Sequence, residues 1–176
     1  MNPREGEEDM ESLDLPDRYA GLDLVVEGGT DDERHALLVA YHTYMVANDH
    51  LDFGLLSTVW HAGAEHLFFN TNGHTYEGLA DWENIWNFYR PQFELVSPYL
   101  PGRLRVGIEG DLAFIASDRV TRFKRWVGGD LKHNPAAYRS TLVLRRGDDG
   151  WRVVHAHFST EDEGLRPDRD PAGAPA

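Results

Sequence analysis

The stretch YRSTLVLRRGDDGWRVVHAHFS (residues 138–159) decides the fold class of this 176-residue chain. Two runs rich in β-branched and apolar residues, 138–146 and 151–159, flank a Gly-Asp-Asp-Gly turn. This pattern predicts a pair of antiparallel strands joined by a tight turn. Upstream, the strand-like runs 104–108 and 112–126 are bounded by similar turns that contain Gly and Asp. The second half of the chain is therefore predicted to form a meander of antiparallel strands.

The first half of the chain has helical periodicity instead. Apolar residues recur every three or four positions over 31–48, and again from Gly78 to Phe93, where Pro91 is expected to end or kink the helix. A shorter helix is expected over 52–60.

Two short strands are expected between these helices, at 66–69 and 75–77, around the tight-turn pair Asn72-Gly73. Helices that precede long hairpins indicate an α+β fold. We expect three N-terminal helices packed on one face of a strongly curved, mostly antiparallel sheet.

The negative charge of the chain is concentrated at its ends. The net charge is −13, and residues 1–33 hold 12 acidic and 2 basic side chains, whereas residues 34–159 hold 13 of each. We expect an acidic, partly disordered leader over 1–30, one domain over 31–159, and a disordered tail over 160–176. Such a chain attracts nucleic acid poorly.

The composition of the chain excludes several kinds of chemistry and a membrane-spanning helix. The chain has no cysteine, which excludes disulfides, a thiolate metal site and a cysteine nucleophile. No apolar run approaches the roughly 20 residues that a membrane helix needs. The sequence therefore predicts a cytoplasmic protein with no membrane or nucleic-acid partner.

Three strings resemble the SnoaL-like branch of the nuclear transport factor 2-like superfamily, over about residues 31–159. The hairpin 138–159, with Gly-Trp at its turn and a His-x-His-x-Ser ending, is similar to the closing hairpin of that family. NDHLDF (48–53) resembles the turn between the family's first two helices, and NGHTYEGLADW (72–82) resembles the loop leading into its third. The resemblance implies a cone-shaped α+β barrel with one deep pocket, assembled into homo-oligomers such as dimers or trimers.

The resemblance also implies acid–base chemistry without an organic cofactor. Asp49 stands where dehydratases of the superfamily carry a catalytic aspartate, and Asp52 is the better cap for the second helix. The dehydratases' usual histidine after the third helix has no counterpart, because residues 92–104 contain none. The histidine that would pair with Asp49 therefore comes from one of four positions: His42, His66, His155 and His157.

His155 and His157 alternate with apolar residues, so both side chains point to one face of their strand. If that face lines the cavity, one of them is the natural general base, since histidine titrates near neutral pH. If it packs under a helix or at a subunit interface, each histidine has a structural role. A third possibility is a metal site, because His155, His157 and Glu161 reproduce a local metal-binding string of the cupins.

The remaining candidates would bind the substrate or stabilise an anion. Tyr44 and Tyr41 either donate a hydrogen bond to an oxyanion or serve as core aromatics. Arg119 either holds an anionic group in the pocket or pairs with Asp118 or Glu94 on the convex face. Asn70 falls near the isomerases' catalytic aspartate, but an amide cannot take a proton. The expected apolar walls are Trp60, Phe68, Trp82 and Trp86.

The sequence therefore predicts a lyase or isomerase without cofactor or metal, acting on a hydrophobic, aromatic or polyketide-like small molecule. In this prediction an Asp49–His pair is the base, and Tyr44 or Arg119 stabilises the anion. Two alternatives stay open: a non-catalytic ligand-binding or assembly domain, and a metal-dependent enzyme that uses His155, His157 and Glu161.

Overall fold

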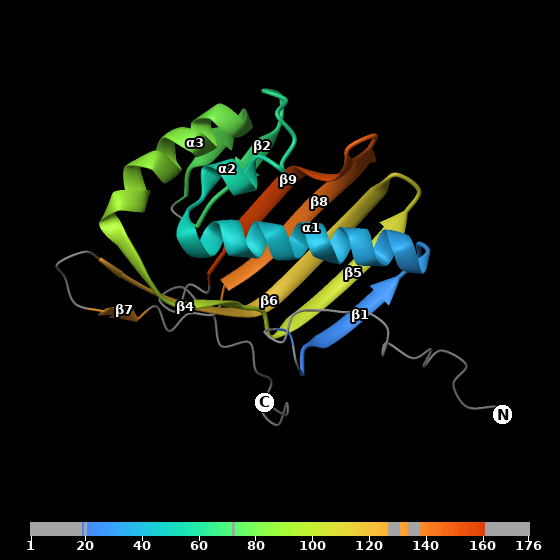
Figure 1. The fold of residues 1–176 in the computed structure, drawn as a ribbon, viewed down its shortest axis with the longest axis horizontal. Helices are drawn as coiled ribbons and strands as arrows, with labels where there is room; N and C mark the ends of the chain where they lie inside the picture. Colours follow the sequence, from blue (N-terminus) through green and yellow to red (C-terminus); the bar gives the residue numbers. More distant parts are fainter. Residues whose placement is uncertain (1–18, 20, 72, 127–130, 134–137, 161–176) are drawn as a thin grey trace, which may run out of the picture.

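A long helix lies across one face of a curved β-sheet, and two shorter helices stand at one end of that face (Figure 1). The computed structural model describes residues 19, 21–71, 73–126, 131–133 and 138–160. Most of the expected leader, nearly all of the expected tail, and Glu161 lie outside the described residues. The elements in chain order are β1 (Asp23–Glu27), α1 (Asp31–His50), α2 (Phe53–Leu56), β2 (Leu67–Phe69), β3 (Thr75–Glu77), α3 (Gly78–Tyr89), η3 (Arg90–Gln92), β4 (Phe93–Leu100), β5 (Arg103–Glu109), β6 (Leu112–Trp126), β7 (Leu131–His133), β8 (Tyr138–Gly147) and β9 (Gly150–Ser159).

The sheet has the strand order β1-β5-β6-β8-β9-β2-β3. The pairs β1–β5 and β2–β9 are parallel, and the other pairs are antiparallel, as the hairpin turns of the sequence predict. The sheet is curved but open, because β1 and β3, which end this order, are not paired with each other. The expected α+β class with helices on one face is confirmed.

Strand β6 is long enough to belong to two parts of the sheet. Its first half pairs with β5 and β8, and its second half pairs with β4 and β7. A register shift after Ser117 in the β6–β8 pairing marks the transition. Register irregularities bend and twist a strand, and β4 and β7 lie on either side of this second half of β6 (Figure 1).

Helix α1 has well-formed ends. Thr30 caps its N-terminus in a reciprocal capping box with Glu33, and acidic residues fill its first turn, where the helix dipole favours negative charge. At the other end Leu51 adopts a left-handed conformation with φ of 50° and closes the helix. The helix buries Leu37 and Leu38 and the following inward side chains against the sheet.

The core lies between α1 and the inner face of the sheet, meaning the face that α1 covers. Alternate residues of β5, β6 and β8 point to this face, and Leu104, Ile115 and Leu142 are almost fully buried there. The outer face, opposite α1, carries the intervening residues and remains exposed at large apolar side chains such as Phe114 and Phe69.

Three expectations about elements need correction. Residues 23–27, assigned to the leader, form β1, which pairs in parallel with β5. Phe93, expected at the end of the third helix, begins β4, because Pro91 stops the helix and only one 3₁₀ turn follows. The helix expected over 52–60 ends at Leu56, and Trp60 instead forms an isolated bridge with Val153 of β9.

Candidate functional site

The inner side of the last turns of α1 carries the buried polar groups of the helix. Tyr41, Tyr44 and Asn48 are spaced by three and four residues, which places them on one helix face, and Asp49 lies beside them. Asn48, Asp49 and Ser117 are the buried polar or charged side chains among the described residues. Asp49 is therefore the one buried carboxylate in the part of the chain that the structure describes.

Asp49 joins α1 to β4. Its Oδ1 accepts a hydrogen bond from the backbone N–H of Tyr99 at 2.6 Å. The β4–β6 register shifts between Ser97 and Leu100, so this N–H lies in an irregular part of the ladder and Asp49 supplies its acceptor. The prediction that Asp52 caps the second helix is confirmed, because its Oδ1 accepts from Leu55 N–H at 3.0 Å.

An aromatic cluster fills the space between the end of α1, the loop after α2, and α3. The ring of Trp60 lies 4.4 Å from Phe68, 5.1 Å from Trp82 and 6.2 Å from Tyr44, measured between centroids. Phe158 of β9 closes the cluster, at 6.2 Å from Tyr44 and 5.9 Å from Trp82. The structure thus brings together Tyr44, Trp60, Phe68 and Trp82, and Trp86 packs behind Trp82 at 6.4 Å.

Two neighbouring donors in this cluster lack acceptors. The indole Nε1 atoms of Trp60 and Trp82 are buried and have no hydrogen-bond partner among the described residues. A buried donor without an acceptor costs about 1–3 kcal/mol. A third indole, that of Trp151, is in the same condition, but it lies at the start of β9 under the guanidinium of Arg146. Trp60 and Trp82 thus place two unsatisfied indole donors in one aromatic cluster.

The histidines of β9 lie on the outer face. His155 pairs with Val143 and His157 with Thr141, whereas the intervening Ala156 is fully buried against the core. His155 Nδ1 is 2.8 Å from the carbonyl oxygen of Leu67, and both imidazoles contact the ring of Phe69. The expectation that the two share a face is confirmed, and that face is the one opposite α1.

His66 lies just before β2, beside an exposed loop. Its Nε2 is 2.9 Å from His61 Nδ1 and 3.5 Å from Glu65 Oε1. Burial lowers the pKa of His66, and the nearby His61 and Arg145 lower it further, while Glu65 opposes them. His61, Glu65 and His66 form a group whose ligand atoms lie within 4.8 Å of one another. His42, the fourth histidine considered, is bonded through Nδ1 to the hydroxyl of Tyr19 at 3.0 Å.

The other predicted site residues fall in different places. Tyr41 is buried in the core beside Tyr44, with ring centroids 6.0 Å apart. Asn70 holds the turn after β2, where its Oδ1 accepts from Thr71 N–H. The backbone of Arg119 belongs to β6, but its side chain lies outside the described residues. Asp118, its alternative partner, is paired with Arg103.

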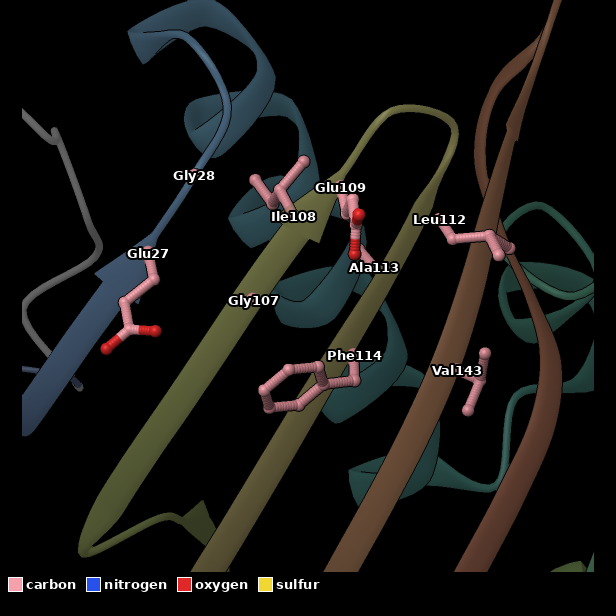
Figure 2. A pocket seen from close by; sticks show the side chains of 9 residues that line it. All are labelled: Glu27, Gly28, Gly107, Ile108, Glu109, Leu112, Ala113, Phe114 and Val143. Carbon is pink, nitrogen blue, oxygen red and sulfur yellow. The ribbon is translucent and has the colours of Figure 1, made fainter.

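A concavity lies on the outer face of the sheet. The hollow has a volume of about 440 Å³. In Figure 2 Phe114 lies near its centre, Glu27 and Val143 lie on opposite sides, and Glu109 lies at the end of β5. The ring of Phe114 lies across Gly107, where a Cβ atom would come within 2.3 Å of Cε1. Gly107 therefore makes room for the ring of Phe114 by having no side chain.

Helices on one face of a bent, open, mostly antiparallel sheet define the nuclear transport factor 2-like fold. The family model for the SnoaL-like domain matches residues 36–163, and the chain belongs to this family. No curated protein matches the sequence significantly. None of the helices in the described part of the chain is long and apolar enough to cross a membrane.

Solved structures share the fold at low sequence identity. A nuclear transport factor 2-like protein from Salmonella enterica is 20% identical, with a TM-score of 0.60 over 78% of this chain and 97% of its own. A ketosteroid isomerase-like protein from Erwinia carotovora is 16% identical, with a TM-score of 0.61 over 76% and 99%. A candidate dehydratase from Streptomyces avermitilis is 18% identical, with a TM-score of 0.60 over 74% and 97%.

Sequence reasoning missed two features of these sites. The contact between Asp49 and Tyr99 N–H depends on β4, which was not predicted. The grouping of His61 with Glu65 and His66 was also missed, although the string HAGAEH (61–66) contains its signal. Histidine at one end of a six-residue loop and Glu-His at the other can meet when the loop folds back.

Proposed function

We propose that this chain binds a hydrophobic aromatic small molecule against the cluster of Tyr44, Trp60, Phe68 and Trp82, and that Asp49 is the base of a lyase or isomerase reaction on it. The observation that carries the proposal is the pair of buried indole N–H groups without acceptors, on the same side of the molecule as the one buried carboxylate of the described residues. Family membership supports the proposal, since a candidate dehydratase and a ketosteroid isomerase-like protein share the fold.

The proposed roles follow from chemistry. Asp49 follows Tyr44 by five residues on α1, which is about 7.5 Å along the helix axis. A ligand carbonyl that accepts hydrogen bonds from Trp60 and Trp82 becomes more acidic at its α-carbon, because the donors stabilise the enolate oxygen. The Asp49 carboxylate would take the α-proton. This proposal replaces the Asp–His pair by a single carboxylate, because the hydrogen bonds of His66 and His155 run to His61 and to the Leu67 carbonyl.

The second candidate is a ligand-binding domain without catalysis. The bond from Tyr99 N–H to Asp49 favours it, since that bond gives the buried carboxylate a structural role. The two candidates differ in whether a bound ligand exchanges a proton. Assembly into a homo-oligomer and location in the cytoplasm also stay predictions.

The test uses 2-acetylnaphthalene, which has a carbonyl acceptor and exchangeable α-protons, and 2-ethylnaphthalene, which has neither. Equilibrium dialysis measures binding of each, and ¹H NMR in D₂O follows loss of the acetyl methyl signal. We expect the acetyl compound to bind more tightly and to exchange faster with the protein than in buffer. Binding of neither compound, or equal binding of both, contradicts the proposed ligand site.

Two variants test which side chains are responsible for binding and for proton exchange. Asp49→Asn keeps an oxygen for Tyr99 N–H and removes the base, so we expect unchanged binding and loss of catalysed exchange. Trp82→Phe keeps an aromatic ring and removes one donor, so affinity for the acetyl compound should fall by about 2–12-fold, the value of one hydrogen bond of 0.5–1.5 kcal/mol. Trp86→Phe is the matched control on the same helix. Binding that depends on Trp82 without any exchange would favour the non-catalytic candidate.

A further inference from the structure

We propose that His61, Glu65 and His66 bind a divalent transition-metal ion of the zinc class on the loop between α2 and β2. The three side chains supply two imidazoles and one carboxylate, a donor set that suits Zn²⁺ and its neighbours Co²⁺ and Ni²⁺. The proposal is independent of the ligand proposed for the aromatic cluster, because it uses none of the same side chains.

Two of the three donor–donor distances are close to those of a metal site. In a tetrahedral zinc site with bonds of about 2.0–2.1 Å, donor atoms lie about 3.3 Å from one another. Here His66 Nε2 is 2.9 Å from His61 Nδ1 and 3.5 Å from Glu65 Oε1, and all three donor atoms lie within 4.8 Å of one another. The separation of His61 Nδ1 from Glu65 Oε1 is at most 4.8 Å, so a movement of up to about 1.5 Å of these exposed side chains would bring the three donors to bonding geometry.

The hydrogen bonds at the site favour the ligating form of His61. The backbone N–H of Gly63 donates to His61 Nδ1 at 3.0 Å, so this nitrogen carries a lone pair and not a proton. In the metal-free protein His66 Nε2 then carries the proton that lies between the two rings. A metal ion would take the lone pair of His61 Nδ1 and that of His66 Nε2, so the proton on His66 Nε2 would leave or move to its Nδ1, and the bond from Gly63 N–H to His61 Nδ1 would open.

The loop that carries the ligands is held at both ends. His61 N–H donates to the carbonyl of Val153 at 2.9 Å, and the carbonyl of His66 accepts from Gly78 N–H at 2.7 Å. The middle of the loop packs on α3, because a Cβ atom on Gly78 would lie 2.9 Å from the Cα atom of Ala64. A loop fixed in this way loses little entropy when it binds an ion.

Gly63 positions the carboxylate. The Glu65 side chain folds over Gly63, so that a Cβ atom there would lie 2.4 Å from Oε1. Gly63→Ala would therefore displace the carboxylate without removing any ligand atom. Because the displaced atoms are the end of a flexible, exposed side chain, this variant should fold normally. Arg145 is the nearby cation that opposes an added positive charge.

The test uses the full chain after treatment with EDTA. Isothermal titration with ZnCl₂ should show one bound equivalent, and CoCl₂ should produce the visible absorption of a tetrahedral cobalt site. His66→Gln and Glu65→Gln should each weaken zinc binding at least tenfold, and Gly63→Ala should weaken it too. His50→Gln, at the exposed end of α1, is the control and should bind as the wild type does.

The rival location is the outer face, where His155 and His157 lie near one another. The double variant His155→Gln/His157→Gln should leave zinc stoichiometry and affinity unchanged. The proposal is overturned if the wild type takes up no stoichiometric zinc, if His66→Gln binds as tightly as the wild type, or if the outer-face variant alone abolishes binding.

Discussion

Gly28 is the point where the connection from β1 to α1 touches the sheet most closely. Its φ is +74°, and a Cβ atom on it would lie 2.1 Å from the carbonyl oxygen of Ile108 in β5. That oxygen belongs to the backbone of a paired strand and cannot move as a side chain does. Gly28→Ala should therefore destabilise the protein both through backbone conformation and through this contact.

The variant Gly110→Ala separates the cost of the backbone conformation from the cost of the steric contact. Gly110 also has a positive φ, +59°, but a Cβ atom there would meet nothing within 4 Å. Alanine in this conformation costs about 1–2 kcal/mol, and both variants share that cost. The overpacking at Gly28 adds about 1–3 kcal/mol. Gly28→Ala should thus be less stable than Gly110→Ala by about 2 kcal/mol, or about 4–8 °C in Tm for a domain of this size.

Urea denaturation followed by tryptophan fluorescence, together with scanning calorimetry, measures both variants side by side. The comparison also tests β1, since Gly28 reaches Ile108 only if residues 23–27 pair with β5 as the structure shows. Equal stability of the two variants would refute the close approach and the placement of β1. A similar m-value in both would show that the difference comes from the folded state.

Three further predictions concern stability. Asp52→Ala should lower Tm by about 2–4 °C, because it removes a helix cap of about 1 kcal/mol, whereas Asp52→Asn should restore most of the loss. Hydrogen bonds from Thr30 N–H and Arg146 hold the pKa of Glu33 below its usual 4.5. The resulting stabilisation of the folded state is present above pH 4.5 and disappears as the pH falls through the lower pKa that Glu33 has in the folded protein. The urea midpoint of Glu33→Gln should therefore depend less on pH in acid than that of the wild type. Leu142→Ala, at a fully buried site, should cost about 2–5 kcal/mol by urea denaturation, and Leu112→Ala, 49% exposed, should cost under about 0.5 kcal/mol.

The parts of the fold with strong local signals could be predicted. The start of α1 follows from Thr30 and the acidic first turn, and the β8–β9 hairpin follows from its alternation and its turn. The strands β1 and β4, by contrast, could not be predicted from the sequence. β1 is a short run inside an acidic segment, and its partner is about 80 residues away, so no local pattern shows the pairing. β4 contains Pro98, which a regular central strand excludes, but its pairing is irregular on both sides of Ser97.

The candidate site could also be predicted only in part from the sequence. Alternation correctly placed His155 and His157 on one face, because side chains in a strand alternate with period two. It could not identify the face, since β9 is apolar on both sides and has a register shift at Val143 and Leu144 of its partner. The aromatic residues that meet around Trp60 were expected to lie together, but the indole donors without acceptors depend on packing that only the structure gives.

The place of β9 in the sheet has a consequence for synthesis of the chain. Strand β9, the last strand in the described part of the chain, lies between β8 and β2, so it joins the early β2–β3 hairpin to the later strands, and Phe68 pairs with Ala156. While the ribosome is still making β8, strand β2 of the hairpin lacks β9, the strand with which it pairs in the sheet. A nascent chain paused before Gly150 would expose Trp60, Phe68 and Trp82 together, and we expect such a chain to be held by chaperones until the final strand emerges.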